Sequence, residues 1–429
     1  MSDRRVMVIQ MGARRNYVAA RQLEAAGLLR SLVCDQAWAE GRVPALTRAV
    51  ARRRPSLAGK IARRTVTGVD PSRIHASTLP TLATGLGGRL TSLERAYVLA
   101  DEVHARLISS RLVDEVDVIV SYFGNGGSLL DRAKARGKTI VTDFTNHPRF
   151  WERLNEERRR WPGWEHDPAA DENRRIYEAR YAHWVAVSDV YLCPSPSVAD
   201  ALASTPGFDP TRVRLTPYGA SGFVTAPART IPGRVLFGAS TLSLVKGIAY
   251  LAEAATLLRE RRTGIEIHLA GSVPEGWAEK PELADLHFLG QLDKRRMSEE
   301  FAEADLFCLP SLAEGSATVI YEAMANGVPV VTTASSGSVI TDGVEGVIIP
   351  ERDGSAIADA IESIVGDRNR RDAMSAAARA TSERYSDERC GDRFVEVVRE
   401  ALARHRGRAS PLLGNAVGGV HGAALETAR

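Results

Sequence analysis

The sequence is short of the residues and runs that mark disulfide-bonded, metal-binding or membrane-spanning proteins. Its four cysteines are scattered through 429 residues without a Cys-x-x-Cys pair, so we expect reduced, buried thiols and neither a disulfide framework nor a metal site. No stretch approaches the ~18 unbroken apolar residues of a membrane span. No secretory hydrophobic region follows the polar start MSDRR. We therefore expect a cytoplasmic protein.

A large excess of charge of one sign is also lacking. The chain carries 56 basic and 53 acidic residues, and a net charge of +3 is too balanced to indicate a nucleic-acid partner. The loop around Gly12 is not a Gly-x-Gly-x-x-Gly motif, which argues against a dinucleotide site there. The histidines show no zinc-ligand spacing. With 44% hydrophobic residues, the composition excludes a disordered chain.

What the sequence does contain is a regular alternation of short β-branched runs with longer helical patterns. The predicted strands begin at residues 6, 31, 116, 139, 190 and 213 in the first half, and at 234, 265, 286, 305, 328 and 346 in the second. Runs this apolar, without polar alternation, suit strands that are buried on both faces of a parallel sheet. Their alternation with helices is typical of βαβ units and predicts an α/β fold.

A stretch rich in glycine and proline divides the chain. We predict a doubly wound domain over 1–217, a linker over 218–233 and a second doubly wound domain over 234–384. A C-terminal helix over 385–405 is expected to pack back on the first domain, and 406–429 are expected to form a flexible tail. Ligands of such sheets bind at the carboxyl ends of the strands, so the predicted site is the cleft between the domains.

The strongest motif is PSLAEGSATVIYEAMANGVPVV at residues 310–331. A strand ends at its proline, a loop carries Glu314, and a helix begins near 316–318 and ends at Asn326 and Gly327. Such a helix start offers free N–H groups and a positive dipole end to a phosphate. Glu322 can accept two sugar hydroxyls, and Glu314 can reach a neighbouring group of the same ligand. This combination suits a nucleotide-sugar; the alternative is an ordinary helix start with acidic residues near its dipole.

This region resembles the glycosyltransferases of family 4, retaining enzymes of the two-domain GT-B fold that use nucleotide-diphosphate sugars. The residues that match the family motif are Glu314, Glu322, Ala323, Gly327, Pro329 and Val330. The resemblance implies that Glu322 binds the donor ribose and that Glu314 faces the transferred sugar. It also implies that a run of backbone holds the sugar hydroxyls and the diphosphate, namely Gly315, Ser316, Ala317, Thr318 and Val319.

Other segments between about residues 185 and 390 are similar to landmarks of the family. Among them, FLGQL at 288–292 is similar to the loop whose backbone reads the base, and the predicted donor-binding residues there and on the neighbouring strand are Gly271, Gly290, Gln291 and Leu292. In one departure, the family's arginine after the strand glycine is absent. Ser240 and Thr241 stand there and can donate hydrogen bonds without charge. Asp-x-Asp, the metal-binding device of the other major glycosyltransferase fold, does not occur, so we expect a metal-independent enzyme.

Lys246 is the predicted cation of the donor site. It precedes Gly247 at the start of an amphipathic helix, where it can reach a diphosphate in the cleft. At ~4 Å and an effective dielectric near ~20, the attraction is about 4 kcal/mol before desolvation. A leaving diphosphate gains charge as the glycosidic bond breaks, so this contact favours the transition state. A solvated surface lysine is the alternative.

In the family's fold the first domain binds the acceptor. Gly12, in the loop after the first strand, is predicted to approach the donor through its backbone, although a plain turn is the alternative. Asp143 and His147 follow the strand from residue 139 and are candidate catalytic residues near the transferred sugar, as family 4 enzymes often carry such a residue in this region. A turn aspartate and a surface histidine remain the alternative.

Two further segments could meet an acceptor or a membrane. Residues 147–165 carry Trp151, Trp161 and Trp164 among arginines, which suits carbohydrate stacking or a packed helix with a basic face. Residues 46–64 are basic and amphipathic, which suits peripheral contact with anionic lipid at the inner face of the membrane, or a solvated helix pair.

The leading hypothesis is retaining transfer of a sugar from a nucleotide-diphosphate donor to a hydroxyl of a saccharide, lipid-linked or small-molecule acceptor. The setting would be polysaccharide, glycolipid or glycoconjugate biosynthesis. The nucleotide-sugar is a co-substrate, and no resident cofactor is expected. Two alternatives remain open: a nucleotide-sugar epimerase or hydrolase of the same fold, and a catalytically silent nucleotide-sugar-binding protein.

Overall fold

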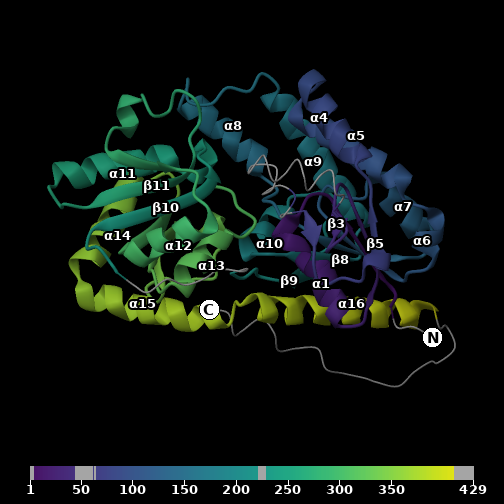
Figure 1. Ribbon diagram of the computed structural model, residues 1–429. Coiled ribbons are helices and arrows are strands. Elements are labelled where there is room, and N and C mark those ends of the chain that lie inside the picture. Colours follow the sequence, from purple (N-terminus) through teal and green to yellow (C-terminus); the bar gives the residue numbers. More distant parts are fainter. Residues whose placement is uncertain (1–3, 44–60, 62–63, 221–228, 410–429) are drawn as a thin grey trace.

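The computed structural model describes residues 4–43, 61, 64–220 and 229–409, which form two α/β domains side by side (Figure 1). Most of the basic segment 46–64, the middle of the predicted linker 218–233 and nearly all of the predicted tail 406–429 lie outside these residues. The four cysteines are buried and unpaired, as predicted. Among the described residues, no helix combines the length and apolar character needed to cross a membrane.

The first domain is built on a seven-stranded parallel sheet in the order β5-β2-β1-β6-β7-β8-β9. Its central strands β1 and β6 are buried along their whole length, as their unbroken apolar runs predicted. The strands are β1 Val6–Gln10, β2 Leu29–Cys34, β5 Ile74–Ala76, β6 Val118–Tyr122, β7 Thr139–Asp143, β8 Val190–Cys193 and β9 Val213–Leu215. The sequence did not reveal β5, nor the small pair β3 Trp38–Ala39 and β4 Thr65–Val66.

The second domain is built on a six-stranded parallel sheet in the order β12-β11-β10-β13-β14-β15. All its strands were predicted from the sequence. They are β10 Arg234–Thr241, β11 Glu266–Ser272, β12 Leu286–Gly290, β13 Leu306–Leu309, β14 Val330–Thr333 and β15 Gly346–Ile349. In both sheets the strands that follow the first strand of the domain (β1 or β10) are added first on one side of it and later on its other side. The crevice at the carboxyl ends of the strands around that first strand is where such sheets bind ligands.

Helices connect and cover the strands. Those of the first domain are α1 Val18–Ala25, α4 Leu79–Leu90, α5 Leu93–Leu107, α6 Ser110–Asp114, α7 Gly127–Ala135, α8 Phe150–Arg160, α9 Ala170–Val187 and α10 Pro196–Leu202. Those that follow are α11 Ile248–Glu260, α12 Lys294–Glu303, α13 Thr318–Ala325, α14 Gly354–Gly366, α15 Arg368–Glu383 and α16 Asp387–Ala409. Short 3₁₀ turns occur at η1 Arg14–Tyr17, η2 Pro71–Arg73, η3 Pro210–Arg212, η4 Leu244–Lys246, η5 Pro281–Leu283 and η6 Ala334–Ser336.

The last helix, α16, returns the chain from the second domain to the first. It lies under the first domain and contacts α1, β6 and β7 (Figure 1). The chain returns beside the outgoing crossing, where Ala220 bridges Ser386 and the Arg393 side chain donates to the carbonyl of Pro217 at 3.3 Å. The helix extends to Ala409, a few residues into the predicted tail.

The segment rich in tryptophan and arginine forms part of the seam between the domains. Its helix α8 is followed by Trp161 and Trp164, which pack against Tyr250 and Trp277 of the second domain at ring distances of 5.9 and 5.1 Å. The indole of Trp277 donates to the carbonyl of Trp164 at 2.9 Å. Trp151 and Trp164 are 5% and 7% exposed. Trp161 and Trp164 therefore serve packing between the domains, as the packed-helix alternative predicted. Trp151 lines a cavity at the seam, so for this residue the carbohydrate-stacking interpretation stays a prediction.

Candidate active site

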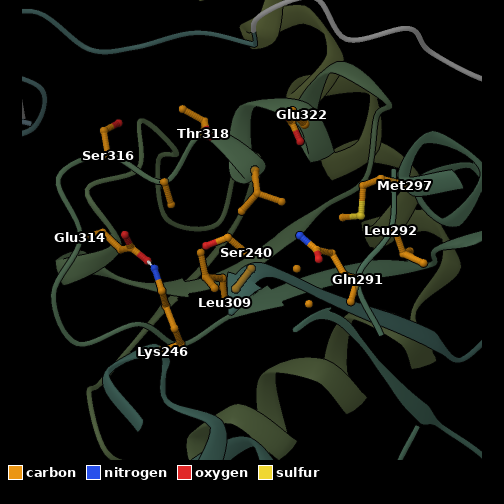
Figure 2. A pocket seen from close by; sticks show the side chains of 16 residues that line it. Ser240, Lys246, Gln291, Leu292, Met297, Leu309, Glu314, Ser316, Thr318 and Glu322 are labelled. Atoms are coloured by element: carbon orange, nitrogen blue, oxygen red, sulfur yellow. Dashed lines mark hydrogen bonds and ion pairs between the residues drawn. The ribbon is translucent and has the colours of Figure 1, made fainter. Parts of the chain in front are cut away.

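A cavity of about 450 Å³ opens at the carboxyl ends of strands β10, β11 and β13, and we call it the second-domain cavity. Figure 2 shows the side chains that line it, which come from the ends of β10, β11 and β13, from the η4 turn, from two loops, and from α12 and α13. Of the predicted donor-binding residues, those lining it are Ser240, Lys246, Gly271, Gln291, Leu292, Glu314, Ser316, Ala317, Thr318, Val319 and Glu322. Residues far apart in the sequence are thus brought together around one space.

Some predicted residues do not line this cavity. Thr241, the last residue of β10, is exposed and pairs with Ser272 in the sheet, outside the lining. Gly290 ends β12 outside the lining, and Gly315 lines a neighbouring cavity instead. The lining residues that the sequence interpretation missed are Gly238, Ala239, Ala270, Met297 and Leu309. All but Met297 lie at carboxyl ends of predicted strands, which was the available signal.

Helix α13 begins at Thr318, and no side chain caps its first turn. Its amino end faces the second-domain cavity through Ala317, Thr318 and Val319. Uncapped N–H groups and the positive end of the helix dipole provide electrostatic attraction for an anionic group here. At the other end, Asn326 caps the helix and Gly327 adopts a positive φ of 67°, as the motif predicted.

The Lys246 side chain is positioned by a close backbone contact. Gly247 has a φ of 77°, and a Cβ there would lie 2.1 Å from the carbonyl oxygen of Pro310. Only glycine therefore lets the η4 turn approach the end of β13, where the 310–318 loop begins. The approach places the Lys246 ammonium on the carboxylate of Glu314, with which it forms an ion pair (Figure 2). Ser311 also donates to Glu314, at 3.1 Å.

This ion pair was not predicted, and it alters the expected role of Lys246 as the cation of the donor site. The two side chains are 22% and 17% exposed, and they neutralise one another at the edge of the cavity. Lys246 is therefore not an isolated cation that waits for a phosphate. An anionic ligand has to share the ammonium with Glu314 or displace that carboxylate from it.

Glu322 lines the other side of the cavity (Figure 2). Burial raises the pKa of its carboxyl to about 7, an effect that Lys294 partly opposes. Near neutral pH the carboxyl is therefore divided between a form that only accepts hydrogen bonds and a form that can also donate one. Both forms can bind sugar hydroxyls.

His147 faces a second cavity of about 340 Å³, the junction cavity, which both domains line. The same cavity is lined by Lys246, Glu314 and Gly315, so the histidine lies on the space that they share. Burial, together with Arg153 and Arg149, lowers the pKa of the imidazole to about 4. The backbone N–H of Arg149 donates to Nδ1 at 3.1 Å. The ring is therefore neutral at pH 7 and carries its proton on Nε2, which can donate to a ligand.

Asp143 lies elsewhere. It faces a small cavity of about 30 Å³ that is also lined by Arg15, Tyr122 and Cys390, and it lines neither cavity that contains Glu314. The hydroxyl of Tyr218 donates to its Oδ1 at 3.0 Å, and burial raises the pKa of this carboxyl to about 6. The structure therefore does not bring Asp143 to the predicted catalytic site, because the interdomain crossing supplies Tyr218 as its hydrogen-bond partner in a separate space.

Gly12 lines a third space, the first-domain cavity of about 520 Å³, rather than the second-domain cavity. Its N–H donates to Asp35 at 2.9 Å. The first-domain and junction cavities share four lining residues, namely Glu94, Tyr97, Asn146 and Tyr177. The junction and second-domain cavities share three, namely Lys246, Glu314 and Ser316. Three adjoining spaces thus run from one domain into the other.

Over the parts of the chain that the structure describes, no three His, Cys, Asp or Glu side chains are grouped so that they could hold a metal ion.

Comparison with known proteins shows which family and which enzymes the chain is similar to. Residues 232–381 match the family described as Glycosyl transferases group 1. A D-inositol 3-phosphate glycosyltransferase of Xylanimonas cellulosilytica is 28% identical over 52% of this chain and 60% of its own length. A phosphatidyl-myo-inositol mannosyltransferase of Mycobacterium leprae is 28% identical over 33% of this chain and 39% of its own length. The chain thus spans less than two thirds of the curated relatives that it matches.

Solved structures extend the likeness to nearly the whole chain. Anabaena HepE in complex with UDP and glucose aligns over 92% of this chain and 99% of its own, with a TM-score of 0.54 and 15% identity. Sucrose-phosphate synthase from Thermosynechococcus elongatus aligns over 93% and 99%, with a TM-score of 0.59 and 16% identity. At such identities the likeness shows the fold, which is the predicted two-domain GT-B architecture. Within that architecture, the match to the Glycosyl transferases group 1 family covers residues 232–381, which is nearly the whole second domain.

Proposed function

We propose that the protein is a retaining, metal-independent glycosyltransferase of family 4 that moves a sugar from a nucleotide-diphosphate donor to a hydroxyl acceptor. The observation that carries the proposal is the convergence of the predicted donor residues on one cavity. Lys246, Gln291, Glu314 and Glu322 come from four segments, yet all line the second-domain cavity. This cavity opens through the junction cavity toward the first domain, where an acceptor would bind.

The donor would lie across the second-domain cavity. The base would meet Gln291 and Leu292, the ribose would bind Glu322, and the diphosphate would lie at the start of α13 beside Lys246. The sugar would then enter the junction cavity, where Glu314 and the Nε2–H of His147 can bind its hydroxyls. The nucleoside diphosphate gains charge on leaving, so contacts with Lys246 and the helix dipole are strengthened in the transition state.

In the proposed reaction, the bond between the anomeric carbon and the diphosphate oxygen breaks on the same face on which the acceptor oxygen bonds to that carbon. The leaving diphosphate oxygen takes the proton of the acceptor hydroxyl. No separate general base is required, which agrees with the position of Asp143 away from the site. The neutral His147 is suited to hydrogen bonding and poorly suited to accepting a proton at its occupied Nδ1.

The test is product analysis with a panel of nucleotide sugars, each offered with and without acceptors. The acceptor panel includes inositol phosphates and phosphatidylinositol, because curated relatives are named for them. The proposal expects a glycosylated product only when an acceptor is present, with the anomeric configuration of the donor retained in its NMR spectrum. Free sugar or an epimerised donor without acceptor would instead identify a hydrolase or an epimerase. Donor binding without any product would identify a silent binding protein.

A further inference from the structure

Helix α4, Leu79–Leu90, carries a row of exposed leucines. Leu79, Leu82, Leu86 and Leu90 are 51%, 58%, 63% and 82% exposed, and we call them the leucine face. Their spacing of three, four and four residues places them on one side of the helix. Single exposed leucines are ordinary on protein surfaces, but a row along one helix calls for a partner.

The other sides of α4 are occupied. Pro80 and Gly87 are buried, and a Cβ on Gly87 would lie 3.2 Å from the Cβ of Ala96 on α5. Thr81, Thr84 and Gly85 line the first-domain cavity. Figure 1 shows α4 at the outer edge of the domain, beyond α5. Among the described residues, nothing covers the leucine face enough to bury its side chains.

The sequence before and within α4 is basic and carries no acidic residue near the helix. No acidic residue occurs between Asp70 and Glu94, and Arg89 is the one charged residue of α4. Residues 42–64, which precede the helix in the sequence, contain seven arginines and Lys60 and no acidic residue. An apolar helix face in a stretch without acidic residues meets no charge repulsion at the interface of an anionic bilayer.

The leucine face also leads to the cleft. Leu90 ends α4, and Leu93, which is 46% exposed, begins α5 after a two-residue turn. Leu93 and the 41% exposed Tyr97 line the junction cavity, where the sugar is proposed to be transferred. Apolar side chains therefore extend from the outer edge of α4 to the entrance of the proposed acceptor space.

We propose that the leucine face docks on the interface of an anionic lipid bilayer. As a consequence that rests on the proposed function, the acceptor is a membrane-anchored amphiphile. Its polar head enters the junction cavity past Leu93 and Tyr97 while its acyl chains remain in the bilayer. Docking of α4 places the entrance of the cleft at the level of the lipid head groups.

The test measures binding to vesicles of phosphatidylcholine, with and without phosphatidylglycerol, by co-sedimentation. The full-length wild-type chain is expected to bind vesicles that contain phosphatidylglycerol. The double variant Leu86→Ser, Leu90→Ser should bind them at least ~10-fold more weakly, because two side chains that would enter the interface become polar. The matched control is Leu215→Ser, on strand β9, where the leucine is 51% exposed but lies on another surface. The control should bind as the wild type does.

Several outcomes would overturn docking. They are wild-type protein that does not bind the anionic vesicles, a double variant that binds as well as the wild type, and a control that loses binding equally. A wild-type dimer in sedimentation velocity that the double variant abolishes, together with no vesicle binding, would instead identify the leucine face as an interface between copies of the chain.

Donor binding separates this proposal from the proposed function. A nucleotide sugar should stabilise the wild type and the double variant equally against heat, because the leucine face is remote from the second-domain cavity. The double variant should transfer sugar normally to a water-soluble acceptor and at least ~10-fold more slowly to a lipid acceptor in vesicles. Equal loss on both acceptors would contradict the lipid-acceptor proposal. Vesicle binding without donor stabilisation would leave docking standing and contradict the transferase.

Discussion

The two walls of the cleft are built in different ways. In the second domain the wall consists of strand ends, the first turn of α13 and small side chains, with one ion pair between Lys246 and Glu314. In the first domain it consists of large side chains that distant segments hold in place. There Arg180 pairs with Glu94, and the indole of Trp151 donates to the same carboxylate at 3.0 Å. Strand ends and a helix start suit the binding of a nucleotide-diphosphate, whereas side chains held in place by ion pairs and hydrogen bonds can be specific for one acceptor.

Two buried carboxyls extend the comparison. Burial raises the pKa of both, to about 7 for Glu322 and about 6 for Asp143. Asp143 accepts a hydrogen bond from Tyr218 inside a small closed space, whereas Glu322 lines the large second-domain cavity. A raised pKa therefore does not identify a functional carboxyl by itself; the space that the group faces separates the two.

The largest effect is expected for Lys246→Ala. Turnover should fall on the order of 10²–10³-fold, since one transition-state stabiliser is deleted and Glu314 loses its ion-pair partner. Single-turnover kinetics with a donor that binds would measure the effect. Lys280→Ala is the matched control, because Lys280 lies over Trp164 at 5.3 Å and does not line the second-domain cavity. A near-wild-type rate for Lys246→Ala would assign the phosphate charge to other groups.

The next effect distinguishes two residues that the sequence placed together. His147→Ala should slow turnover about 10- to 100-fold, through loss of one hydrogen-bond donor in the junction cavity. Asp143→Asn should change turnover by less than about threefold, because its space is separate and an amide oxygen can still accept from Tyr218. Steady-state kinetics of both variants would decide. The reverse order of effects would restore Asp143 to the site and remove His147 from it.

A smaller effect concerns stability and pH. The raised pKa of Glu322 means that the folded state holds its proton more tightly than the unfolded chain. Its contribution therefore favours folding at low pH and is lost as pH rises from about 4.5 to about 7. Glu322→Gln should gain stability relative to wild type at pH 8 compared with pH 4, by about 1–3 kcal/mol. Urea unfolding of both proteins at the two pH values would measure this. A constant difference would show that Glu322 is not desolvated.

The smallest effect expected is that of chelation. EDTA should leave turnover unchanged, since Lys246 and the start of α13 supply the positive charge that a metal would otherwise bring. The assay compares initial rates before and after chelation, with Mg²⁺ added back. Complete loss that Mg²⁺ restores would contradict the metal-independent assignment.

The sequence predicted the two sheets because buried parallel strands leave unbroken apolar runs. It missed the short strands β3, β4 and β5, which have two or three residues each, although it predicted β9, which has three. The loop and helix from Glu314 to Glu322 were readable because their groups lie within one local unit. Chain folding alone brings Met297 to the cavity from α12, and no nearby motif signals it.

The first domain was harder to read for a related reason. Asp143 and His147 are four residues apart, and their separation depends on Tyr218, which the interdomain crossing supplies. Trp161 and Trp164 pack against Tyr250 and Trp277, which lie far away in the sequence, so the sequence offered no sign of this packing. Packing between segments far apart in the sequence leaves no local pattern.

The central claim is that the second-domain cavity binds a nucleotide-sugar through Glu322. Titration calorimetry of the wild type and Glu322→Ala with a panel of nucleotide sugars tests it most directly. We predict that at least one donor binds the wild type, and that the variant, still folded by circular dichroism, binds it about 1–3 kcal/mol more weakly. Equal affinity of the two proteins for that donor, or no binding by any nucleotide sugar, would contradict the account.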